Sequence, residues 1–369
     1  MQSERNYKIS NCQFLLCVLI VFIHSGCLFM NIPGNTEMQT VFGVNYSSYI
    51  QLFIIEGICR IAVPLFMMIS GYLFYLSFDG SWKSYGNKLK RRFFSLVIPY
   101  LFWSSLTFLA FFFAQKFLGM GEFFTTRNND SINVLFLLKN IVLDSYDSPL
   151  WFCRYLIVFA ILSIVLYWPL KKCPIIVFVL LLYLWLFNGK FFSFIPPGLR
   201  FDSIFFYFFG AIIALHKDYY KRVEEKINKP TIIVAGVIYF LLLSIRTLFF
   251  CYQDPNYLLI GDENIILDIS TKILIPLGMF AFWYSYDYIF KNKNELLKLS
   301  GYSFLIFAAH HPIVNVIKKV AFRFIDYNYL SSILVYLLSA IITIIIIILV
   351  GVIIKRFVPI LWKISTGNR

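Results

Sequence analysis

The sequence is poor in charge, in histidine and in the motifs that mark many soluble enzymes. Only 14% of its 369 residues are charged, and only four are histidine. It has no nucleophile elbow, no phosphate-binding P-loop and no HExxH motif, which excludes the enzyme classes built on those motifs. Its seven cysteines form no CxxC pair and have no histidine partner at zinc spacing, so no metal site is expected.

Apolar residues are what the chain has in excess. They make up 60% of it, and the mean hydropathy is +0.75, whereas a soluble globular chain is about half apolar. A spanning helix needs about 20 apolar residues, and lipid leaves helix as the only local structure. The sequence therefore predicts an all-α integral membrane protein, a bundle of about ten transmembrane helices. The expected spans are 12–31, 50–77, 92–117, 150–169, 174–190, 202–216, 230–250, 267–289, 300–320 and 330–355.

Lysine and arginine gather in alternate inter-helix loops. This alternation accounts for the net charge of +14 by the positive-inside rule, so no nucleic-acid partner is expected and both termini are predicted to be cytoplasmic. The opposite loops carry acids such as Glu37, Asp144 and Asp147. The longest of these, 118–149, is the expected place for a lid or short interfacial helix. No linker or appended soluble domain is evident, so residues 1–369 are expected to form one transmembrane domain.

Ionisable residues inside the expected spans are the most informative, because such residues are costly in lipid and usually functional. Helical rise places Arg60 at a depth close to that of His24, so a shared polar cavity inside the bundle is predicted. Simple helix–helix hydrogen bonding is the alternative. The candidates are His24 in the first span, Glu56 and Arg60 in the second, Arg154 beside Trp151 in the fourth, and His310 and His311 in the ninth.

A basic cluster precedes the third expected span and comprises Lys88, Lys90, Arg91 and Arg92. Its ordinary role is to set topology and contact anionic membrane lipids. Arginine also binds phosphate groups through paired contacts. The cluster is therefore compatible with binding a phosphate-rich cofactor at the cytoplasmic mouth of the cavity.

Imidazole and basic cluster together favour acyl transfer. An imidazole can deprotonate a hydroxyl near neutral pH, and a basic mouth suits an acyl-coenzyme A donor. In this interpretation His24 activates a sugar hydroxyl, which attacks the thioester. Arg60 or Arg154 would stabilise the developing oxyanion or orient a substrate.

Five segments, taken in order, resemble motifs of the membrane-bound acyltransferase 3 family, whose members acylate surface polysaccharides and related glycans. They are ISNCQFLLCVLIVFIHS (9–25), RIAVPLFMMISGYLF (60–74), KRRFFSLVIPYLFW (90–103), PLWFCRYLIVF (149–159) and YSFLIFAAHHPIV (302–314). The resemblance implies that His24 is the catalytic residue, and it places Ser70, Trp151 and the late-helix histidine in family motifs. His310 fits that last position by spacing from Phe307, with His311 as the alternative.

The resemblance also implies a bacterial cytoplasmic-membrane enzyme that uses acetyl-coenzyme A and no metal. Its acceptor would be a cell-surface polysaccharide or a lipid-linked glycan. The chain departs from the family at position 13, where Gln13 replaces an arginine thought to position the donor, and at position 10, where Ser10 replaces a common aspartate. Gln13 can hydrogen-bond but carries no charge.

Several alternatives therefore stay open. Arg60 or the basic cluster compensates for Gln13, donor handling is altered, or the chain is a catalytically inactive family member. A transporter or flippase of glycans or small polar solutes would use the same polar cavity for alternating access. A non-catalytic membrane scaffold is a further possibility.

Overall fold

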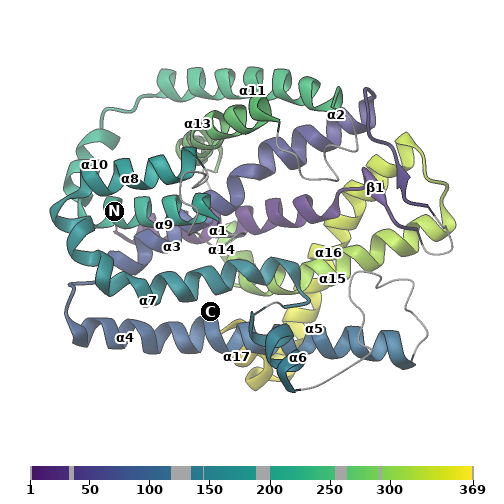
Figure 1. The fold of residues 1–369 in the computed structure, drawn as a ribbon, viewed down its shortest axis with the longest axis horizontal. Coiled ribbons are helices and arrows are strands. Elements are labelled where there is room, and N and C mark those ends of the chain that lie inside the picture. The colour runs from purple at the N-terminus through teal and green to yellow at the C-terminus, as the bar shows by residue number, and fades with distance from the viewer. Residues whose placement is uncertain are drawn as a thin grey trace.

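A computed structural model describes residues 2–32, 37–117, 134–143, 145–187, 200–253, 264–290 and 293–367. Most of its long helices lie side by side along a common direction (Figure 1). Within these residues, eight helical segments are long and apolar enough to cross a membrane. Two shorter apolar helices, α8 (Pro174–Leu186) and α9 (Phe201–Leu215), match the fifth and sixth predicted spans. The protein is thus an all-α, multi-pass membrane protein, as predicted.

The remaining elements follow the predicted order. The long helices are α1 (Gln2–Ser25), α3 (Ala62–Tyr75), α5 (Ile98–Phe117), α7 (Trp151–Lys172), α11 (Lys229–Cys251), α13 (Ile265–Ile289), α15 (Ser303–Phe324) and α16 (Tyr329–Phe357). Short helical elements are α2 (Tyr46–Leu52), η1 (Phe53–Gly57), η2 (Ile58–Ile61), α4 (Trp82–Arg92), η3 (Phe93–Val97), α6 (Val134–Leu138), η5 (Lys139–Leu143), η6 (Ser148–Leu150), α10 (Lys217–Glu224), α14 (Lys293–Ser300) and α17 (Pro359–Thr366). Strands β1 (Phe29–Met30) and β2 (Gln39–Thr40) pair antiparallel.

The first helix is shorter at its outer end than the predicted span 12–31, because α1 stops at Ser25. Lys318 Nζ donates to the carbonyl oxygens of His24 (2.8 Å) and Gly26 (3.1 Å). Gln51 Oε1 accepts from the backbone N–H of Cys27 at 2.8 Å. These distant side chains satisfy backbone groups that a helix end leaves unpaired. His24 consequently lies in the last turn of α1 rather than part-way along a longer span.

Two glycines bring α3 and α9 into backbone contact. A Cβ atom at Gly71 would lie 1.9 Å from the carbonyl oxygen of Tyr207, and one at Gly210 would lie 2.0 Å from that of Met68. Small residues allow membrane helices to approach in this way. Gly71 therefore has a steric role in its motif, and the contact fixes α3 as a wall of the bundle.

The basic cluster is helical rather than part of a loop, since α4 runs through the π turn η3 into α5. Lys88 Nζ donates to the carbonyl oxygen of Phe74 and to Ser77 Oγ (2.9 Å), and so caps the end of α3. Lys90 and Arg91 are exposed, whereas Arg92 is half-buried. Lys88 and Arg92 therefore turn toward the bundle, whereas Lys90 and Arg91 face away from it.

The described part of the predicted outer loop 118–149 begins with α6 and η5 and ends in the 3₁₀ turn η6. Ser104 Oγ and Tyr100 OH donate to the carbonyl oxygens of Ile141 and Val142, at 2.7 Å each. This segment therefore packs on α5. Residues 118–133 and Asp144 lie outside the described residues.

Candidate functional site

Three imidazole rings from two helices meet at the end of α1. The ring centre of His24 lies 5.2 Å from that of His310 and 5.1 Å from that of His311, both on α15. His24 is half-buried, whereas His310 has no exposed surface. The structure thus brings together the three intramembrane histidines that the sequence singles out.

Hydrogen bonds fix the proton on His310. Its Nδ1 lies 2.7 Å from the carbonyl oxygen of Phe307 and 3.0 Å from that of Ile306. Carbonyl oxygens only accept, so Nδ1 carries the hydrogen and Nε2 presents a lone pair. That Nε2 has no hydrogen-bond partner among the described residues. A neutral His310 is therefore suited to accept a proton at Nε2 and cannot donate one from there to an oxyanion.

Sequence reasoning missed two charged residues beside the imidazoles. Lys318 is 6% exposed and holds the end of α1, as described above. Asp147 is 1% exposed, and its Oδ1 lies 3.8 Å from His311 Nδ1. Lys318 had a readable signal, because it follows His311 by two helical turns and so shares its face. Asp147 looked only like a topological acid in an outer loop.

A cavity of about 430 Å³ opens between α1, α3, η3, α7 and α15. Three predicted residues line it: Gln13, Ser70 and Arg92. The other polar lining residues are Ser10, Ser95, Ser300 and Ser303. A guanidinium among hydroxyl and amide groups can bind phosphate oxygens. Lys88, Lys90 and Arg91 are not among its lining residues.

The cavity borders the middle of α1, at Ser10, Gln13 and Cys17, whereas the histidine cluster lies at the last turn of that helix. From Gln13 to His24 the helix rises about 16 Å. Phe307 lines the cavity, and its ring centre is 6.3 Å from that of His310. Phe152 lies 5.5 Å from Phe307, ring centre to ring centre. Aromatic rings therefore stand between the polar cavity and the buried imidazole.

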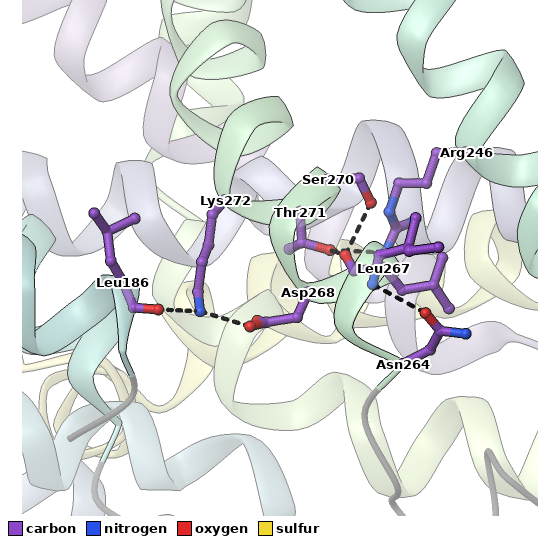
Figure 2. A network of polar contacts seen from close by, with 9 residues as sticks. Leu186, Arg246, Asn264, Leu267, Asp268, Ser270, Thr271 and Lys272 are labelled. Carbon is purple, nitrogen blue, oxygen red and sulfur yellow. Dashed lines mark hydrogen bonds and ion pairs between the residues drawn. The ribbon is translucent and has the colours of Figure 1, made fainter. Parts of the chain in front are cut away.

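The candidates Glu56 and Arg60 form an ion pair with each other, at 3.4 Å, within a second cluster of polar residues. Arg246 of α11, which the sequence analysis overlooked, donates to the carbonyl oxygen of Glu56 (3.2 Å) and to Thr271 Oγ1 (2.9 Å). Figure 2 shows Arg246 beside Thr271 on α13, the residue that directly precedes Lys272 of the Lys272–Asp268 pair. Among the described residues, no hydrogen bond, ion pair or ring contact joins Arg60 to the imidazoles.

Among the described residues, no hydrogen bond, ion pair or ring contact joins the two predicted residues at the start of α7, Trp151 and Arg154, to the imidazoles. The guanidinium of Arg200 stacks on Trp151, with Cζ 4.2 Å from the ring centre, and Arg200 pairs with Asp202 at 3.6 Å. Arg154 is half-buried and makes no hydrogen bond or ion pair within the described part of the chain. Its guanidinium is therefore not committed to a structural partner there.

The part of the chain that matches known proteins includes the residues of both the cavity and the histidine cluster. Residues 6–352 match the acyltransferase domain that defines the acyltransferase 3 family. The succinoglycan biosynthesis protein ExoH of Rhizobium meliloti (strain 1021) is 25% identical over 361 residues, spanning 95% of this chain and 90% of that protein. No solved structure matches the chain.

Proposed function

Since the chain belongs to the acyltransferase 3 family, we propose that this membrane acyltransferase moves an acyl group, acetyl above all, from acyl-coenzyme A to a hydroxyl of a polysaccharide or lipid-linked glycan. The relative ExoH is named for succinoglycan biosynthesis, which supports a polysaccharide acceptor. We place the enzyme in the bacterial cytoplasmic membrane, with residues 1–369 acting as one domain and both termini in the cytoplasm.

The observation that carries this proposal is the meeting of His24, His310 and His311 at the end of α1, with a phosphate-compatible cavity beside the middle of the same helix. Imidazole has the proton affinity that general base catalysis needs near neutral pH. The cavity supplies a binding place for a charged donor. The histidine cluster alone would not provide one. The cavity would bind the donor, and the histidine cluster would transfer the proton.

We assign the phosphate groups of the donor to Arg92, with Gln13 and the serine hydroxyls around them. Arg92 lines the same cavity as Gln13, so it supplies the positive charge that Gln13 lacks. The exposed Lys90 and Arg91 would attract the anionic donor to this mouth. The acyl-bearing arm would then extend along α1, past Phe307, toward His24.

In the reaction, His24 removes the proton from the acceptor hydroxyl as its oxygen attacks the thioester carbonyl. The new C–O bond forms, the C–S bond breaks, and the proton passes from His24 to the departing thiolate. Arg154 is our candidate for stabilising the oxyanion, because Arg60 is already paired with Glu56. His310, with its bare Nε2, would assist as a proton acceptor.

Purified protein in lipid nanodiscs, supplied with acetyl-coenzyme A and isolated surface glycan, tests the proposal. We expect coenzyme A release that requires the glycan and is lost by at least about 100-fold in His24→Ala. The matched control is His216→Ala, since His216 contacts the carbonyl oxygen of Leu170 at 3.1 Å, away from the cluster. Glycan movement without coenzyme A release would identify a transporter, and full activity of folded His24→Ala would refute the assigned base.

A further inference from the structure

Asp147 is a buried carboxylate that lies beside the imidazole of His311. It precedes η6, and neither carboxylate oxygen has a hydrogen-bond partner among the described residues. Its Oδ1 lies 3.8 Å from His311 Nδ1, an ion-pair separation rather than a hydrogen bond. Leaving a carboxylate so poorly solvated is costly. A role through charge, rather than through stability, explains why the group is held there.

The other nitrogen of His311 settles which way its proton faces. Asn315 Nδ2 lies 3.2 Å from His311 Nε2, and an amide NH₂ group donates, so Nε2 accepts and Nδ1 carries the hydrogen. The N–H of His311 therefore faces Asp147. His310 has the same tautomer, but its Nδ1–H donates to carbonyl oxygens of its own helix.

The charges around His24 make a counter-charge necessary. The ammonium of Lys318 lies at the carbonyl oxygen of His24, 2.8 Å away. A proton taken up by His24 would place a second positive charge beside it, and like charges at such separations repel strongly in a low-dielectric site. Among the residues that surround the imidazoles in the described part of the chain, Asp147 is the acid that can offset that charge.

We propose that Asp147 is a positioning residue for acyl transfer, acting through His311. Its carboxylate orients the His311 ring against His24 and stabilises the positive charge that His24 holds between taking the hydroxyl proton and giving it to the thiolate. This inference rests on the proposed function. Burial raises the pKa of the Asp147 carboxyl well above its ordinary value, so the ionised form in turn depends on the positive charge of the imidazole cluster.

A double-mutant cycle tests this path. Asp147→Asn is expected to lower kcat about 10- to 100-fold. The KM for acetyl-coenzyme A should stay within about twofold, because the cavity lined by Gln13 and Arg92, which we assign to the donor, is untouched. His311→Asn is expected to lower kcat similarly. The variant that carries both substitutions should have the same kcat as His311→Asn alone. Once the His311 ring is gone, the Asp147 carboxylate has no ring to act through, so its removal changes nothing further. Asp147→Glu, which keeps the charge, should recover most of the activity.

The control is Asp326→Asn, which removes an exposed carboxylate just beyond the end of α15, the helix that carries His311. This variant should leave kcat unchanged. Additive losses in the double variant, or an unchanged kcat in Asp147→Asn, would overturn the proposal. If Asp147→Asn does not insert, Asp147→Ser, a smaller replacement, runs the same cycle. Failure of the proposed function is distinct, because the wild-type protein would then release no coenzyme A.

Discussion

Two cavities of similar size border α1 and α3, yet their linings differ. The cavity that we assign to the donor, called the donor cavity below, has a volume of about 430 Å³ and is lined by Gln13, Ser70 and Arg92. The second, of about 460 Å³, lies among α1, α3, α8, α9, α10 and α13, and its lining is almost wholly apolar, with aromatic rings such as Trp185 and Phe280. The volume of a cavity therefore does not tell whether it can bind a charged cofactor or is only an apolar gap between membrane helices.

The difference arises from neighbouring residues on the same helices. Ile69 lines the apolar cavity and Ser70 the donor cavity, and Ile9 and Ser10 divide in the same way. One step along a helix turns a side chain by about 100°, so adjacent residues face different spaces. The donor cavity is thus defined by which face carries a few polar groups, a property that mean hydropathy does not register.

The strongest test of the difference between the two cavities is to place a phenylalanine in each, at the adjacent positions 70 and 69. We expect Ser70→Phe to lower kcat/KM for acetyl-coenzyme A by about 100-fold, because the ring occupies donor space. Ile69→Phe should change it by less than about threefold, at some cost in stability. Steady-state kinetics in nanodiscs, with thermal unfolding to confirm folding, measure both. Equal losses would mean that the assignment of the donor cavity is wrong.

Removing the charge from the donor cavity should have the next largest effect. Arg92→Ala is expected to raise the KM for acetyl-coenzyme A about 10-fold with kcat nearly unchanged, the loss of a charge-assisted contact worth about 1.5 kcal/mol. Arg92→Lys should fall between, because lysine lacks the paired donors. Lys83→Ala, at an exposed position at the start of the same helix, α4, is the control. An unchanged KM in Arg92→Ala would remove Arg92 from the donor site.

The apolar cavity should affect stability rather than catalysis. Phe280 lines it and lies 4.8 Å from Tyr284, ring centre to ring centre. Phe280→Ala removes that packing and is expected to lower Tm by a few degrees, with stability reduced by about 1–3 kcal/mol. Its kcat/KM for the donor should match that of the wild type when measured well below Tm. A selective loss of kcat would show that this cavity also takes part in the reaction.

The smallest effect is expected from restoring the family residue. Gln13→Arg adds a second positive charge to the lining that Arg92 already serves, so donor affinity should hold or rise slightly, within about threefold. The KM for acetyl-coenzyme A and the rate of acylation measure this. A sharp loss of activity would show that the cavity of this chain is arranged around an uncharged residue at position 13.

Much of this arrangement could be predicted from the sequence. Long apolar runs are direct consequences of lipid as solvent, and the scarcity of intramembrane histidine made His24, His310 and His311 stand out. The end of α1 could not be predicted, because it depends on Lys318 and Gln51, which are remote in sequence. Helical depth alone also could not predict the partners of Arg60, which pairs with Glu56, since depth along the membrane says nothing about which side of a helix faces the cluster.

The bond from Lys318 to the end of α1 has a mechanical consequence. α15 carries His310 and His311, and its Lys318 also donates hydrogen bonds to the backbone carbonyl oxygens of His24 and Gly26. Relative sliding of the two helices must therefore rupture this anchor before the ring spacing changes. The spacing of the three imidazole rings is accordingly coupled to the position of α15 along the end of α1.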